Sequence, residues 1–75
     1  MKVTVNRVPY EYEGETLTLD DVRTMASLPP DHVVFRSEGS SIQPFLPDMK
    51  LSPRPKGYTF VARPLSYGQV GNIAG

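Results

Sequence analysis

Few side chains in this 75-residue sequence are arranged for catalysis. Glu11 and Glu13 alternate with tyrosines, so a strand would place both carboxylates on one polar face, but the sequence positions no companion acid, base or electrophile beside them. Ser40 and Ser41 follow a glycine, yet nothing nearby would activate a serine hydroxyl as a nucleophile. The single histidine, His32, cannot hold a metal ion alone, and there is no cysteine. The sequence therefore predicts a protein that is not an enzyme and that uses neither a metal nor a cofactor.

The composition indicates one small domain held together by packing alone. A chain of this length buries only about 60% of the surface that it exposes when unfolded, and without cysteine no disulfide can add to that. No apolar stretch is long enough for a signal peptide or a membrane span, which predicts a cytoplasmic protein with no membrane partner. Eight Lys and Arg balance eight Asp and Glu, so no net field attracts nucleic acid.

The charges are nonetheless segregated along the chain. An acidic run is followed by a basic one: Glu11, Glu13, Glu15, Asp20 and Asp21, then Lys50, Arg54, Lys56 and Arg63. Two interpretations stay open: two solvated faces, or a polarised surface that docks a partner.

Two runs of alternation near the start predict a hairpin. Residues 2–6 place Val3 and Val5 on one face, and residues 10–13 place two tyrosines opposite two glutamates. The link at residues 6–9 contains turn formers, which favours antiparallel pairing of the two strands.

A short helix is predicted near residues 19–27. Thr18 can cap its first turn, and the two acidic residues after Leu19 favour the positive end of the helix dipole. Apolar residues then recur at helical spacing, including Val22 and Met25, and Pro29 prevents the helix from continuing.

The second half predicts two more strands with a proline-rich segment between them. Residues 32–36 and 58–62 are rich in β-branched and aromatic residues. Four prolines in residues 42–55 allow only short or edge strands there, such as residues 49–51. A hairpin, a helix crossing one face and a return strand parallel to the first give an α+β fold of the β-grasp type. We expect a mixed sheet of four to five strands with one crossing helix.

Several stretches resemble the ubiquitin superfamily, and most closely its bacterial multiubiquitin-type proteins. They are the opening Met-x-Val-x-Val, Val-Asn-Arg-Val-Pro-Tyr-Glu-Tyr at 5–12, Leu-Pro-Pro-Asp-His-Val-Val at 28–34 and Met-Lys-Leu-Ser-Pro at 49–53. The resemblance covers most of residues 1–62. It implies a ubiquitin-like domain at 1–63 and a flexible C-terminal tail at 64–75, which has no charged residue.

In ubiquitin-like proteins the tail is the functional part. The resemblance implies that an activating enzyme uses ATP to adenylate the Gly75 carboxylate, and that the acyl group passes to a lysine amine of a target protein. The enzymes would then recognise Ile73 and Ala74 in the tail. Glycine suits this chemistry because it has no Cβ. The terminus reads Ala74-Gly75 where ubiquitin ends in Gly-Gly, so enzyme recognition should differ in detail.

The implied partners are activating and conjugating enzymes of the ubiquitin kind, target proteins and a JAB-type metalloprotease. Two other functions stay open. A sulfur carrier would use the same terminus as a thiocarboxylate. A protein-interaction module that is not conjugated would use its sheet face instead of the tail.

The sheet register decides which residues such a face would present. If Val33 and Phe35 point toward the helix, alternation turns Val34 and Arg36 outward to a partner-binding face. The expected core then consists of Val3, Val5, Leu19, Val22, Met25, Val33, Phe35, Leu51 and Phe60, with Tyr12 at its margin.

Overall fold

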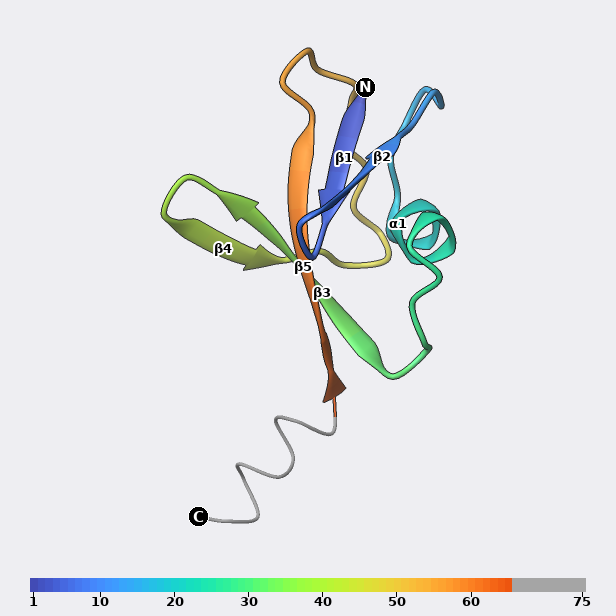
Figure 1. Ribbon diagram of the computed structural model, residues 1–75, viewed down its shortest axis with the longest axis vertical. Helices are drawn as coiled ribbons and strands as arrows, with labels where there is room; N and C mark the ends of the chain where they lie inside the picture. The colour runs from blue at the N-terminus through green and yellow to red at the C-terminus, as the bar shows by residue number, and fades with distance from the viewer. Residues whose placement is uncertain (66–75) are drawn as a thin grey trace.

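A mixed five-stranded sheet and one helix form an α+β fold in the computed structural model, which describes residues 1–65 (Figure 1). The elements are β1 (Lys2–Val5), β2 (Val8–Glu11), α1 (Leu19–Met25), β3 (His32–Glu38), β4 (Ser41–Pro44) and β5 (Tyr58–Pro64). The strand order is β2-β1-β5-β3-β4. β1 and β5 run parallel, and the other neighbouring strands pair antiparallel. In the described part of the chain no helix has the length and apolar character needed to cross a membrane.

The N-terminal hairpin is confirmed and turns within two residues. Asn6 and Arg7 both have positive φ, at 50° and 71°, and Val5 pairs directly with Val8. Two successive positive φ values define the tight hairpin turn whose twist matches that of the flanking strands. The second strand therefore begins at Val8, earlier than the alternation of residues 10–13 predicted.

The predicted helix is also confirmed, with a complete cap at its start. The Thr18 hydroxyl accepts from the Asp21 amide, and the Asp21 carboxylate accepts from the Thr18 amide at 2.9 Å. This reciprocal pair satisfies two backbone donors that a helix start leaves free. The helix ends at Met25, just short of the expected residue 27, and Ser27 has φ 52°.

The proline-rich segment differs from the prediction. Residues 49–51 form no strand; Leu51 makes a single antiparallel bridge to Leu17. The edge strand is β4 instead, which follows Gly39 in a short turn and pairs with β3. Pro44 ends β4 because proline has no N–H to extend the ladder.

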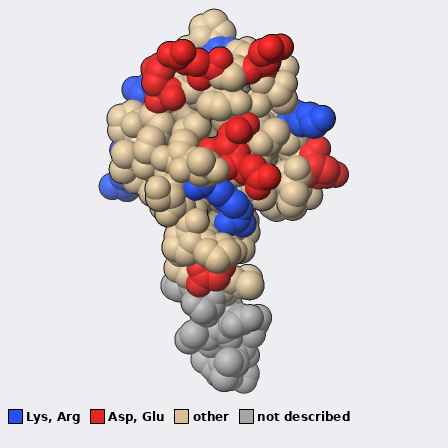
Figure 2. Space-filling view, turned by 90° about the vertical axis from the view of Figure 1, so that its right-hand side faces the viewer, with Lys and Arg blue, Asp and Glu red and all other residues tan. Residues whose placement is uncertain are grey.

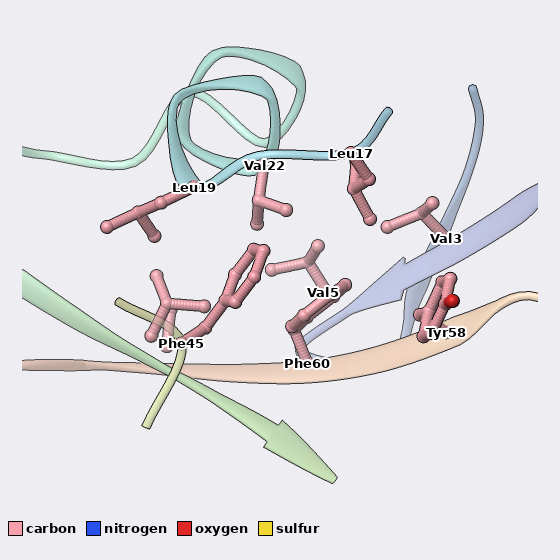
Figure 3. Close-up of a cluster of buried hydrophobic side chains, with 10 residues drawn as sticks. Val3, Val5, Leu17, Leu19, Val22, Phe45, Tyr58 and Phe60 are labelled. Carbon is pink, nitrogen blue, oxygen red and sulfur yellow. The ribbon is translucent and has the colours of Figure 1, made fainter. Parts of the chain in front are cut away.

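The core lies between the helix and one face of the sheet (Figure 3). Val3, Val5, Leu19, Val22 and Phe60 are buried there as predicted. Met25, Leu51 and Tyr12 pack against it while partly exposed. The buried residues that the sequence analysis did not name are Leu17, Val34, Phe45, Tyr58 and Ala62.

Candidate functional site

The predicted conjugation site lies outside the described residues. β5 ends at Pro64, and the description stops one residue later. Ile73, Ala74 and Gly75 are therefore not placed. The site residues that can be located are those of the sheet.

Val34 does not face a partner, and the prediction for this residue is wrong. Val34 is 2% exposed and lies opposite Ala62 on β5. Directly paired residues project to the same side of a sheet, and alternation then places Ala62 and Phe60 on one side. Since Phe60 is fully buried beneath the helix, Val34 has to point inward as well.

Arg36 shares the inner face with Val34, so its predicted place on the outer face is also wrong. It pairs with Phe60 across the sheet. Its guanidinium carbon lies 5.1 Å from the centre of the Tyr58 ring, and Nη2 donates to Glu38 at 3.1 Å. Arg36 thus closes one end of the core instead of standing on the open side of the sheet.

The opposite register gives the open sheet face a different composition. Val33 and Phe35, which were expected in the core, lie half-buried on this outer face. Phe35 pairs with Val61 on β5 and with Pro44 on β4. Ile42, two positions before Pro44, is 65% exposed. We call Val33, Phe35, Ile42, Pro44 and Val61 the apolar outer patch.

A shallow hollow of about 410 Å³ lies at one side of this patch. Threonines and arginines from the β1–β2 hairpin and β5 form most of its lining: Thr4, Asn6, Arg7, Thr59, Phe60, Val61 and Arg63. Hydroxyl groups and two cations in this hollow place polar surface next to the apolar outer patch. That distribution is typical of protein-interaction surfaces.

A cluster of charged side chains lies on the inner face of the sheet, at the end of β3. Glu38 accepts from Arg36 at 3.1 Å and from Arg54 at 2.8 Å through Oε1, and from Lys56 at 3.1 Å through Oε2. The hydrogen bonds from Arg54 and then Lys56 lower the pKa of Glu38 from 4.5 to about 2. We call Arg36, Glu38, Arg54 and Lys56 the Glu38 cluster. The basic run is evident in the sequence, but its pairing with a carboxylate 16 and 18 residues away is not.

The Glu38 cluster includes an aromatic support. The guanidinium carbons of Arg36 and Arg54 lie 5.1 and 3.9 Å from the centre of the Tyr58 ring. The Tyr58 hydroxyl donates to the Ser52 carbonyl at 2.6 Å, which holds the ring in place. Cations over an aromatic face are attracted to its negative potential, so both arginines are held in defined positions.

Acidic side chains gather mainly on another part of the surface. Figure 2 shows them along the upper end and the centre of the face on the helix side. Asp21, one of the acidic run, is only partly exposed. Burial acts to raise the pKa of Asp21, but hydrogen bonds from Thr18 and Tyr12 outweigh it and lower that pKa.

The side chains first considered for catalysis stand apart from one another. Nδ1 of His32 lies 3.0 Å from the neighbouring carboxylate of Asp31. Glu11 and Ser41 are exposed, at opposite edges of the sheet. Within residues 1–65, no three His, Cys, Asp or Glu side chains are grouped to hold a metal ion.

Comparison with known proteins adds no relative to this description. No protein-family model, curated protein or solved structure matches the chain.

Proposed function

We propose that the protein is a β-grasp, ubiquitin-like modifier that is activated by ATP at the Gly75 carboxylate and conjugated to target proteins. The observation that supports the proposal is the order and direction of the strands in the sheet. β5 lies parallel to β1 and between β1 and β3, with the helix crossing between the N-terminal hairpin and β3. β5 leads away from the end of the molecule where β1 begins (Figure 1).

In a conjugation reaction of this kind the activating enzyme and the modifier have different roles, and the described residues are compatible with the role of the modifier. A modifier needs no catalytic groups, because the activating enzyme supplies ATP binding and acid–base chemistry. The modifier supplies a stable domain for recognition and a carboxylate for acyl transfer. Glycine at that position leaves its carbonyl open to a nucleophile because no Cβ shields it.

The test removes Gly75, which leaves the terminal carboxylate on Ala74, one residue short, without touching the described domain. Three proteins are compared: the full chain, the chain lacking Gly75, and Gly71→Ala as a matched change elsewhere in the same segment. Each is incubated with an activating enzyme of the ubiquitin kind, ATP and labelled pyrophosphate. We expect pyrophosphate exchange with the full chain and with Gly71→Ala, and none without Gly75. Thermal unfolding should be the same for all three proteins.

Exchange at the normal rate without Gly75 would contradict the proposal. A sulfur carrier would share the adenylation step, so the fate of the adenylated carboxylate separates the two functions. Incubation with a sulfur donor would give a sulfur carrier an intact mass in which sulfur replaces one oxygen. A modifier would instead form an amide with a lysine of another protein.

The apolar outer patch favours a second candidate, a protein-interaction module that is not conjugated. Ile42 stands 65% exposed beside half-buried Phe35 and Val61, and apolar surface of this kind is suited to a partner. Ile42→Lys would abolish function in that case, and loss of Gly75 would not. The reverse result identifies the modifier.

A further inference from the structure

The Glu38 cluster places three cations around one carboxylate. Arg36 and Glu38 come from β3, whereas Arg54 and Lys56 come from the loop that leads into β5. A single carboxylate balances only one of the three positive charges. The group therefore carries a net local charge of two positive units, although the whole chain is neutral.

The cations of the cluster also have N–H donors that are not used within the described residues. Arg36 Nε is buried and has no hydrogen-bond partner among the described residues. Lys56 gives one hydrogen bond to Glu38, and its side chain is 70% exposed. A lysine ammonium has three donors and an arginine five, so the cluster can bind a further acceptor. Tyr58 already holds both guanidiniums in place. The entropy cost of fixing these side chains on binding an anion would therefore be small.

A small pocket opens beside these donors. It measures about 280 Å³ and is lined by Arg36, Glu38, Ser41 and Gln43. Arg36 pairs with Gln43 and Glu38 with Ser41 across the β3–β4 hairpin, so all four side chains share one face. Ser41 and Gln43 supply neutral donors beside the cations. The volume is at the low end for a small-molecule site and suits one acidic group.

The strand beside the pocket favours a peptide as the source of that group. β4 is an edge strand with all four residues exposed, and the hairpin projects from the sheet in Figure 1. An extended chain can lie along such an edge. Nucleic acid would need a longer stripe of cations, whereas three cations here share their site with a carboxylate.

We propose that the pocket on the inner face of the β3–β4 hairpin, together with the Glu38 cluster beside it, binds a carboxylate side chain from an acidic peptide segment of a partner protein. Glu38 occupies part of the same cationic site and acts as an internal competitor for the incoming carboxylate. The proposal does not depend on the function proposed for Gly75, because it uses only residues 36–58.

The test uses a fluorescein-labelled peptide of alternating glutamate and glycine, with a glutamine–glycine peptide as the uncharged control. Binding is followed by fluorescence anisotropy and by backbone amide shifts at physiological ionic strength. We expect the glutamate peptide alone to bind and to shift Arg36, Glu38, Ser41 and Gln43. Added salt should weaken this binding because charges at the surface are screened.

Two variants with the same change of charge test the location. Lys56→Glu should weaken binding about tenfold, because it replaces attraction with repulsion. Lys50→Glu makes the same change at an exposed lysine outside the cluster and should alter affinity less than about twofold. Glu38→Gln should tighten binding about threefold because the internal competitor is lost. Thermal unfolding of each variant confirms that the protein is folded at the temperature of the measurement.

Four results would overturn the proposal. Equal loss for Lys50→Glu and Lys56→Glu would mean that the peptide senses only overall charge. Shifts confined to Arg7 and Arg63 would place the site on the outer sheet face. Tighter binding of a single-stranded oligonucleotide than of the peptide would identify nucleic acid as the ligand. Self-association that Lys56→Glu abolishes would identify a second copy of the chain as the occupant.

Discussion

The side chain of Asn6 pairs with the backbone of Ala62 through two hydrogen bonds. Nδ2 donates to the Ala62 carbonyl at 3.2 Å, and Oδ1 accepts from the Ala62 amide at 2.9 Å. β1 has already ended at Val5, which pairs with Phe60. The carboxamide of Asn6 thus takes the place of the next peptide group of β1 and extends the ladder beside β5.

Asn6→Gly tests this contact. Glycine accepts the positive φ at this position, so the turn is retained while both polar groups of Ala62 lose their partner. We expect the free energy of unfolding to fall by about 2 kcal/mol, measured by urea denaturation. Arg7→Gly, which also adjusts the turn but breaks no such bond, should instead raise it by about 1 kcal/mol. An Asn6→Gly protein as stable as the parent would show that the two hydrogen bonds contribute nothing.

Val34 and Val33 offer a comparison of the two sheet faces. Val34 is 2% exposed and Val33 is half-buried on the other side. Val34→Ala should cost about 2 to 3 kcal/mol through lost burial and a cavity, and Val33→Ala about 1 kcal/mol or less. Thermal or urea unfolding gives both values. The reverse order would mean that the register of β3 is shifted by one residue.

Alanine substitutions at Gly57 and Gly39 distinguish the cost of a steric clash from the cost of backbone strain. Both have positive φ, 69° and 58°. A Cβ at Gly57 would meet the Lys2 carbonyl oxygen, which belongs to β1 and cannot move aside, whereas a Cβ at Gly39 would meet open space. Gly39→Ala should cost about 1 kcal/mol, and Gly57→Ala about 3 kcal/mol or more. Equal losses of stability would show that strain alone sets the cost.

Stability should fall in acid because two carboxylates have lowered pKa values. Glu38, with a pKa of about 2 against 4.5, contributes stability that is fully present above about pH 4.5 and is lost as the pH falls toward 2. Asp21 acts in the same direction because its pKa is also lowered. Urea unfolding between pH 6 and 2, about the range over which these groups titrate, measures the slope.

Glu38→Gln should flatten that slope, since the variant has no carboxylate to protonate there. Glu15→Gln removes an exposed carboxylate outside the cluster and serves as the matched control. If the two variants titrate alike, the ion pairs of Glu38 do not stabilise the folded state. Raising the salt concentration should reduce the contribution of Glu38, because the cluster is partly exposed.

Local signals in the sequence were sufficient for the elements whose cause is local. Thr18 and Asp21 are three residues apart and cap the helix whatever surrounds them. The turn formers at residues 6–9 bring β1 and β2 together, and the strand parallel to β1 is β5, not the strand that directly follows the helix. Four prolines correctly restricted residues 42–55 to a short edge strand, although its place was wrong.

Three features depended on contacts between distant segments: the register of β3, the burial of Phe45 and the Glu38 cluster. Residues 33–35 are three consecutive apolar residues, so alternation alone allowed either face of β3 to be buried. Pairing with Ala62 and Phe60 selected Val34 for the core and turned Val33 and Phe35 outward.

Phe45 and the Glu38 cluster illustrate the same limit. Phe45 lies between Pro44 and Leu46 in a segment with no apolar periodicity, yet its ring stacks on that of Phe60 with centroids 5.1 Å apart. Glu38 meets Arg54 and Lys56 only when β3 lies beside β5. The sequence by itself determined the N-terminal hairpin, the helix and the two longer strands, because those preferences depend on neighbouring residues. The tertiary structure alone decided which side of β3 is buried and which charges meet, because pairing with a distant strand selects one of two faces that are both apolar in the sequence.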